Sequence, residues 1–272
     1  MIDLSLVMSM KNRILGFILG LSAVIMLIVG SCSVIRPLNT EQIVKYSHDG
    51  VVKMVRVMHF ADGTTAEGSC TAFLIGHEQL LTAAHCFDPL YLLFHEDELL
   101  SSVVKKEFEH TIIDLHGHEF TDFRILKYNI EHDLVLMEIK GFHGESLSMW
   151  NPTFDGEPQP GSEIIALGYP GYFATQFSFE KGLLKAIGRI PTGFGSDGPF
   201  IISMGTLFPG YSGGPTVAAS NGKVIGLNHA GAVIATFRGI NVNLSLAISY
   251  DTILRFLADS GDEEELVGTR VP

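Results

Sequence analysis

Apolar residues in this chain come in many short runs instead of long helical stripes. Each run is rich in β-branched or aromatic residues and ends at glycine, proline, asparagine or aspartate, which is typical of strands separated by turns. A helical pattern with an apolar stripe appears near the end, over 250–258, with Ser249 or Asp251 near its cap. Short strands at this spacing predict an all-β fold of sandwiches or barrels. The predicted strands are 51–58, 69–75, 80–83, 112–115, 123–127, 134–139, 163–167, 177–187, 200–204, 216–218, 224–227, 232–237 and 244–248.

The N-terminal segment predicts export. Lys11 and Arg13 precede an apolar run over 14–30, and a positive region followed by an apolar core is the layout of a secretory signal. The run is also close to the lower limit of about 17 residues for a membrane-spanning helix. We therefore expect residues 1–31 to be a signal or membrane-targeting segment.

Cys32 ends this segment. Small residues lead into it, and the stretch 29–32 (Val-Gly-Ser-Cys) resembles the lipobox of bacterial lipoproteins. In that family the cysteine becomes the lipidated first residue of the mature chain, which implies a lipid anchor in a bacterial cell envelope. The alternatives are an uncleaved membrane anchor and a cleaved signal followed by an incidental cysteine. Met10 is an alternative start to Met1, because the residues after it form a more usual positive region.

The chain has three cysteines, Cys32, Cys70 and Cys86. An exported protein meets an oxidising compartment, where a pair of cysteines can form a disulfide. Cys70 and Cys86 lie inside the predicted strand region, and lipidation would account for the remaining Cys32.

Charge and turn residues divide the rest of the chain. The net charge of −12 and the lack of a basic patch argue against a nucleic-acid partner. Polar residues 32–48 predict a tether, and 49–259 predicts the folded domain. Three prolines and two glycines in 151–161 predict a linker, so the two halves are expected at about 49–150 and 160–250. The acidic tail 260–272 is expected to be solvated.

One serine is placed as a nucleophile would be. Ser212 lies among glycines in the stretch 208–215, where bare backbone N–H groups can approach its hydroxyl. A tight loop between strands is the alternative reading of this stretch alone. A nucleophilic serine needs a base and an acid to orient that base. His85 follows a predicted strand, and Asp133 begins another, where a buried carboxylate needs a partner.

These motifs together resemble the trypsin/chymotrypsin-like serine protease family. Residues 82–86 (Thr-Ala-Ala-His-Cys) match the histidine motif of that family, 133–136 (Asp-Leu-Val-Leu) match its aspartate motif, and 210–215 match its nucleophile loop. The order histidine, aspartate, serine is the chymotrypsin order. The separation of Cys70 and Cys86 is similar to that of the family's disulfide beside the catalytic histidine. The likeness runs from about residue 51 to residue 257.

The resemblance implies a fold and a mechanism. The fold is all-β, with two antiparallel six-stranded β-barrels, a short C-terminal helix and the site in the cleft between the barrels. It implies that Ser212 attacks the scissile carbonyl, that His85 carries the proton and that Asp133 orients His85. The oxyanion hole would be the backbone N–H groups of Gly210 and Ser212. No cofactor is expected.

The substrate pocket is expected by the same resemblance at Thr206, His229 and Gly231. Thr206 at its base is neutral, which does not favour arginine or lysine before the cleaved bond. His229 suggests two alternatives: an acidic preference, as in glutamate-specific bacterial relatives, or a histidine satisfied by the backbone. Tyr211 stands where animal digestive proteases carry the acid of their zymogen switch. We therefore expect no such switch and expect Tyr211 to pack in the loop.

Two further histidines raise the question of a metal. His116 and His118, with Glu119 beside them, give at most two ligands on one face of a strand, too few for a metal site. A solvated turn is the expected structure there, and no metal is expected.

The sequence thus predicts an exported, membrane-tethered serine endopeptidase acting on protein or peptide substrates. The alternatives are a catalytically weak or inactive relative used for binding, and a quality-control protease of the high-temperature-requirement type. The motif Gly-x-Ser-x-Gly at 210–214 also fits the α/β-hydrolases. That class needs an acid and then a histidine after the serine, whereas no acid lies between Ser212 and His229, the only histidine downstream.

Overall fold

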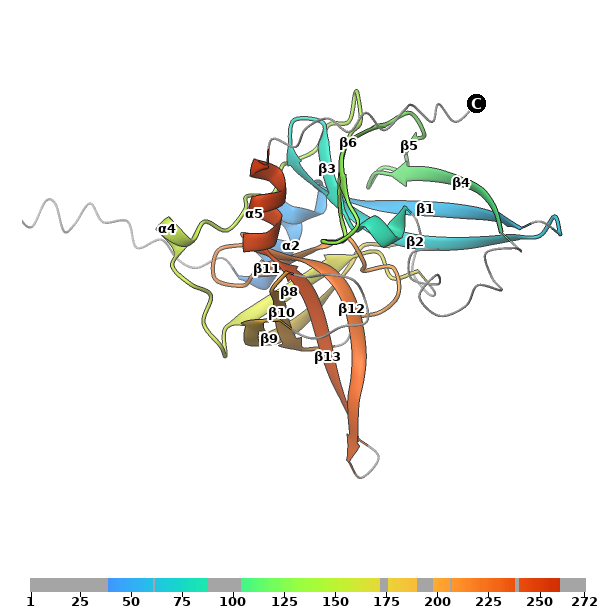
Figure 1. Ribbon diagram of the computed structural model, residues 1–272. Coiled ribbons are helices and arrows are strands. Elements are labelled where there is room, and N and C mark those ends of the chain that lie inside the picture. The colour runs from blue at the N-terminus through green and yellow to red at the C-terminus, as the bar shows by residue number, and fades with distance from the viewer. Residues whose placement is uncertain are drawn as a thin grey trace, which may run out of the picture. The chain divides into compact units, whose positions relative to one another are not determined.

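The computed structural model describes residues 39–60, 62–87, 104–171, 176–189, 198–205, 207–237 and 240–259 (Figure 1). The chain divides into two units, 1–37 and 38–272, and all of the described residues belong to the second. The expected signal segment, Cys32, Thr206 and the acidic tail lie outside the described residues. Among the described helices, none has the length and apolarity needed to cross a membrane.

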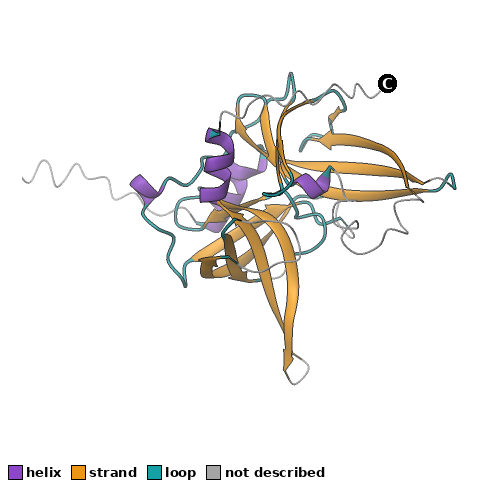
Figure 2. Cartoon of the chain, in the orientation of Figure 1, coloured by secondary structure: helices purple, strands orange, loops and turns teal. Residues whose placement is uncertain are grey.

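The first half of the domain is a curled antiparallel sheet of seven strands, in the order β5-β4-β1-β2-β3-β7-β6 (Figures 1 and 2). We expected a closed six-stranded barrel here. In the described residues β5 pairs only with the end of β4, and β6 pairs only with β7, so these two strands are the edges. A two-residue β5 offers too few backbone groups to close the sheet. The strands are β1 (Val51–Phe60), β2 (Thr65–Gly76), β3 (Gln79–Thr82), β4 (Val104–Ile113), β5 (Glu119–Phe120), β6 (Arg124–Asn129) and β7 (Leu134–Glu138).

The second half is a closed six-stranded antiparallel barrel, in the order β10-β13-β12-β11-β8-β9, as expected. Its hairpin of β12 and β13 extends beyond the other strands (Figure 1). The two predicted strands 224–227 and 232–237 form the single strand β12, because bulges carry the chain through the residues between them. The strands are β8 (Glu163–Gly168), β9 (Ser178–Gly188), β10 (Phe200–Met204), β11 (Pro215–Ala218), β12 (Val224–Phe237) and β13 (Ile240–Ser249).

The C-terminal helix α5 (Tyr250–Ala258) has the predicted bounds. The side chain of Ser249 accepts from the backbone N–H of Thr252 and caps the helix. Lys127 of β6 donates to the carbonyls of Phe256 and Asp259, so the helix is bonded to the first sheet as well as following the second barrel.

Helix α2 (Thr40–His48) was not predicted, because its residues were expected to end a polar tether. Asn39 and Gln42 form a capping box at its start. Ile43 is 1% exposed and belongs to the core, and the partly buried Val44 packs against the same cluster, so these two residues fix the polar helix to the domain. Short helices also occur at η1 (Ala84–Cys86) and α4 (Pro152–Asp155), the latter in the predicted linker.

The main hydrophobic cluster is shared by both halves. It contains Phe73 and Leu81 from the first sheet and Leu167 and Leu227 from the second barrel. A smaller cluster around Trp150 lies within the second barrel. Because the larger core is continuous between the two halves, the loops that connect their strands are held at fixed positions.

Candidate active site

Asp133 occupies a constrained backbone position just before β7. Its φ is +55°, in the left-handed region that aspartate tolerates better than most residues. Its N–H donates to the Ile130 carbonyl at 3.2 Å, and its own carbonyl accepts from Ala84 at 3.2 Å. The turn therefore directs a buried carboxylate, 3% exposed, at the helical turn η1.

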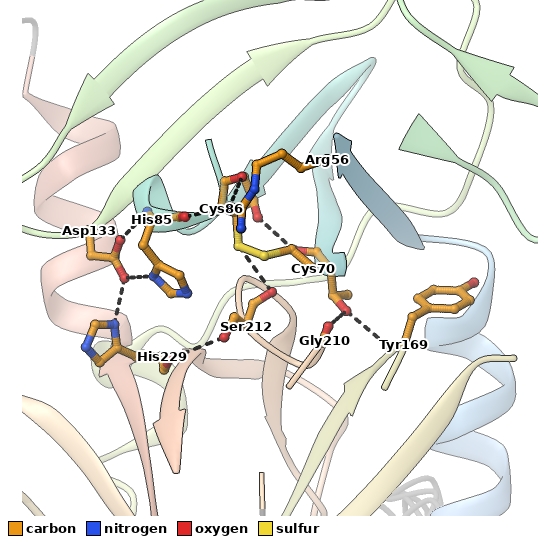
Figure 3. Close-up of a disulfide and its surroundings, with 11 residues drawn as sticks. Arg56, Cys70, His85, Cys86, Asp133, Tyr169, Gly210, Ser212 and His229 are labelled. Carbon is orange, nitrogen blue, oxygen red and sulfur yellow. Dashed lines mark hydrogen bonds and ion pairs between the residues drawn. A yellow bond between two sulfur atoms is a disulfide. The ribbon is translucent and has the colours of Figure 1, made fainter. Parts of the chain in front are cut away.

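His85 lies in the middle of η1 and is fixed from two directions. Arg56 of β1 donates through Nη1 to the carbonyls of His85 and Cys86, each at 3.0 Å. The disulfide between Cys70 and Cys86 ties the same turn to β2, with the two Cα atoms 6.0 Å apart. The predicted disulfide is therefore present, and it adjoins the histidine (Figure 3).

His85 and Asp133 form a two-point pair. The Nδ1 atom of His85 lies 2.8 Å from Oδ2 of Asp133, and the backbone N–H of His85 donates to Oδ1 at 2.8 Å. Asp133 accepts at this bond, so Nδ1 carries the proton and Nε2 is left with a lone pair that can act as a base.

Asp133 stays ionised although it is buried. Burial by itself raises the pKa of a carboxyl group, but the positive charge that His85 carries when protonated and the hydrogen bonds from His229 and His85 outweigh it. The pKa of Asp133 is therefore held well below its ordinary value. A permanently charged acceptor fixes the tautomer of His85 and stabilises the imidazolium that forms when His85 takes a proton.

Ser212 lies across from this pair, in the second barrel (Figure 3). Its Oγ donates to the backbone carbonyl of His229 at 3.4 Å, and its own carbonyl accepts from Thr71 at 2.8 Å. Within the described residues, Oγ makes no hydrogen bond to Nε2 of His85. The hydroxyl must therefore rotate from the His229 carbonyl toward His85 before it can give up its proton.

The loop before Ser212 is shaped by Gly210. Its φ is +100°, and a Cβ at this position would lie 2.2 Å from the Tyr169 carbonyl oxygen, so only glycine fits. Gly171 donates to the Pro209 carbonyl at 2.8 Å. In a planar trans peptide the N–H opposes the carbonyl, so the Gly210 N–H is turned away from Gly171. In the described part of the chain, neither this N–H nor that of Ser212 donates to another group, and both can serve as the expected oxyanion donors.

Thr71 joins the two halves beneath this loop. It is fully buried on β2. Its hydroxyl donates to the Gly210 carbonyl at 2.6 Å and accepts from the Tyr169 N–H at 3.0 Å. Its backbone N–H donates to the Ser212 carbonyl at 2.8 Å, and its carbonyl accepts from Thr82 at 2.7 Å. Sequence reasoning missed Thr71; the only signal was a hydroxyl in an otherwise apolar run beside Cys70.

The sequence left two alternatives for His229, and the structure pairs its side chain with Asp133. Its Nδ1 lies 2.6 Å from Oδ2 of Asp133, and its ring packs edge-on to that of His85 with centroids 5.6 Å apart. The pairing of β12 with β13 shifts between Asn228 and Ala230, which makes His229 the extra residue of a β-bulge. A bulge changes the direction of its side chain, and the ring is therefore buried against Asp133 instead of lining a pocket.

Gly231 and Thr206 were the other residues expected in the substrate pocket. Gly231 approaches Leu207 closely, since a Cβ on Gly231 would lie 2.8 Å from the Leu207 carbonyl oxygen. Thr206, the expected pocket base, precedes Leu207 and lies outside the described residues. Tyr211 is fully buried, and burial raises the pKa of its hydroxyl. Its ring lies against Gly168 of β8, where an added Cβ would be 3.0 Å from Cδ1 of Tyr211.

Two groups of described residues bring three potential metal ligands together. In the first, Cys70 and Cys86 are joined in the disulfide beside His85, so their sulfurs are not thiolates. The second consists of His85, Asp133 and His229, whose hydrogen bonds already account for their closeness. The pair His116 and His118 instead surrounds Asp114, which accepts from both backbone N–H groups and lies 2.8 Å from Nδ1 of His118.

Comparison with known proteins identifies the family of the domain. The model of the trypsin-like peptidase domain matches residues 70–227, more than half of the chain. The chain belongs to the trypsin-like peptidase family. A search of curated protein sequences finds no match.

Solved structures show that the fold of this trypsin-like peptidase is shared with bacterial proteases. The active form of the Rv3671c protease of M. tuberculosis is 18% identical, with a TM-score of 0.60 over 80% of this chain and 84% of that one. Its inactive form is 17% identical, with a TM-score of 0.56 over 81% and 93%. The HtrA-type protease AlgW with a decapeptide is 18% identical, with a TM-score of 0.58 over 80% of this chain and 66% of that one. At these identities the likeness establishes the fold alone.

Proposed function

We propose that this peptidase is a serine endopeptidase that uses Ser212, His85 and Asp133. The observation that carries the proposal is the two-point bond between His85 and Asp133, which leaves Nε2 of His85 as a base on the side of Ser212. The N–H groups of Gly210 and Ser212 support it, because both are available to an oxyanion.

The mechanism follows from these atoms. Ser212 Oγ attacks the carbonyl carbon of the scissile bond while its proton moves to Nε2 of His85. The negative oxygen is stabilised by the two N–H donors, and the imidazolium by Asp133. His85 then gives the proton to the leaving amine, and the acyl-enzyme remains. Water then attacks the ester carbonyl of the acyl-enzyme while His85 takes its proton. The bond to Ser212 Oγ breaks, His85 returns the proton to Oγ, and the acid product leaves.

For the substrate we propose a peptide or protein with a neutral residue before the cleaved bond. AlgW has been solved with a tripeptide and with a decapeptide, which supports a peptide substrate for a chain of the same fold. Thr206 is neutral, and the ring of His229 is engaged by Asp133, so neither a cationic nor an acidic preference finds a partner among these residues.

Labelling with a fluorophosphonate probe tests the nucleophile. We expect the oxidised protein to be labelled and the Ser212→Ala variant to be unlabelled, while Ser203→Ala, a change at a serine of β10, leaves labelling intact. A peptide-library digest then reports the preferred residue before the cleaved bond. Labelling that survives in Ser212→Ala would overturn the proposal, and an unlabelled wild type would favour a binding role. Cleavage mainly after arginine or lysine would contradict the neutral preference.

We also propose that the protein is exported and held at a membrane through lipid on Cys32. The targeting pattern before Cys32 supports this, and so does the disulfide, which is typical of oxidising compartments. Intact-mass measurement of the membrane fraction is expected to show diacylglycerol on a chain that begins at Cys32. A chain that still begins at Met1 or Met10 would refute lipidation.

A further inference from the structure

Two imidazoles share one oxygen of Asp133. Oδ2 lies 2.8 Å from Nδ1 of His85 and 2.6 Å from Nδ1 of His229, while Oδ1 accepts the backbone N–H of His85. The two rings stand nearly perpendicular, at 82°, so they approach the oxygen from different directions (Figure 3). Because a carboxylate can only accept, both rings must present an N–H to it.

We propose that His229 is a positioning residue of the catalytic site, whose Nδ1–H fixes the carboxylate of Asp133 in the orientation that His85 requires. The inference rests on the proposed peptidase function. His229 would act through Asp133 and His85 and would not touch the substrate with its ring.

His229 is itself rigidly held, as a positioning residue must be. It is the bulge residue of β12, between two paired stretches of that strand. The ring of Phe200 from β10 packs on it with centroids 5.4 Å apart, and the side chain is 3% exposed. The Nδ1–H of His229 therefore has little freedom to move. The carboxylate of Asp133 must take the orientation that meets this N–H.

Among the described residues, the hydrogen bonds to the carboxylate of Asp133 come from His85 and His229. Without His229, both contacts to the carboxylate would come from the one residue that it has to orient, so a shift of His85 would carry the carboxylate with it. With His229 present, Oδ2 is bonded to both halves of the fold, since His85 and Asp133 come from the first sheet and His229 from the second barrel. His85 and Asp133 therefore keep their relative geometry when His85 takes up a proton and the two form an ion pair.

The effect is expected in kcat and not in KM. The ring faces Asp133, whereas the part of His229 that reaches Ser212 is the backbone carbonyl, which a side-chain substitution keeps. A donor lost from a buried charged acceptor lowers a rate by roughly ten- to a hundredfold.

A matched pair of variants tests the donor. In His229→Asn the amide nitrogen occupies the position of Nδ1 relative to Cα and can donate to Asp133. In His229→Leu the side chain has the shape of asparagine but no donor. We expect His229→Leu to lose kcat by roughly ten- to a hundredfold with KM unchanged, and His229→Asn to recover most of that loss. Equal activity in all three proteins, or equal losses in both variants, would overturn the proposal.

Proton NMR tests the same bonds without turnover, so that a failure of the peptidase proposal can be told apart. In the Ser212→Ala background, two strongly deshielded imidazole N–H signals are expected, from His85 and His229. His229→Leu should remove one and move the other, because His85 then has the oxygen to itself. A spectrum with one such signal that His229→Leu leaves unchanged would refute the role of His229, whatever the activity of the wild type.

Discussion

At the scale of single residues, Asp133 combines a buried charge with a left-handed backbone. Its charge is kept by donors from His85 and His229, and its backbone conformation by the turn before β7. Because the folded pKa is lowered, the ionised carboxylate stabilises the fold above about pH 4, where the unfolded group titrates, and this contribution is lost as the pH falls through the lower folded pKa. Asp133 therefore remains charged wherever the imidazoles can act as bases.

Asp133→Asn is expected to fold and to be nearly inactive. Asparagine also tolerates the left-handed region, so the turn can form. Its amide, however, presents either an N–H₂ group or a neutral oxygen to the two imidazole N–H donors. It therefore no longer fixes the tautomer of His85. We expect kcat to fall on the order of 10³–10⁴-fold while circular dichroism is unchanged. Asp155→Asn, which breaks an ion pair with Lys223, is the control and should keep full activity. Comparable activity in the two variants would contradict the role of Asp133.

At the scale of elements, strand β2 connects the two halves. Cys70 binds it to η1 through the disulfide, and Thr71 binds it to the nucleophile loop through a buried hydroxyl. Two adjacent residues of one strand thus hold both the turn that carries the histidine and the loop that carries the serine. Because β2 lies in the interior of the first sheet, between β1 and β3, its position is fixed along its length.

Thr71→Val tests this connection. Valine keeps the shape of threonine but leaves the Gly210 carbonyl and the Tyr169 N–H without their partner. We expect the free energy of unfolding to fall by about 2–6 kcal/mol, since two buried polar groups are left unpaired and each costs about 1–3 kcal/mol. Thr71→Ser keeps the hydroxyl and should lose about 1 kcal/mol. Urea unfolding measures both, and a Thr71→Val protein as stable as Thr71→Ser would contradict the assignment.

At the scale of the whole domain, the two halves share one core. The main cluster crosses from the first sheet into the second barrel, and Lys127 bonds the first sheet to α5. Because the main cluster contains residues of both halves, the domain is expected to behave as one cooperative unit.

Unfolding in urea should therefore be a single transition. Trp150, the only tryptophan, reports on the second barrel by fluorescence, and hydrogen exchange of β1–β3 reports on the first sheet. We expect the two probes to give the same midpoint and the same free energy. Distinct midpoints would show that the halves unfold independently and would contradict a shared core.

The sequence by itself determined the features that depend on near neighbours. Alternating apolar residues and turn residues predicted most strands, and the Ser249 cap and apolar stripe predicted α5 with its observed bounds. The motifs around His85, Asp133 and Ser212 indicated which side chains belong to one site. The resemblance of the spacing of Cys70 and Cys86 to that of the family's disulfide indicated their bond. All of these patterns are visible within a few residues or in a spacing that the family shares.

Only the tertiary structure decided what joins distant segments. The partner of His229 lies 96 positions earlier in the chain, and the hydroxyl of Thr71 meets a carbonyl 139 positions later. The direction of His229 depends on a bulge, which a strand pattern does not reveal, and so the sequence did not indicate its contact with Asp133. Helix α2 is held by the burial of Ile43 in a core built elsewhere, and the first sheet stays open because β5 is short. Contacts of this kind are set by packing between elements, which the order of residues within each element does not encode.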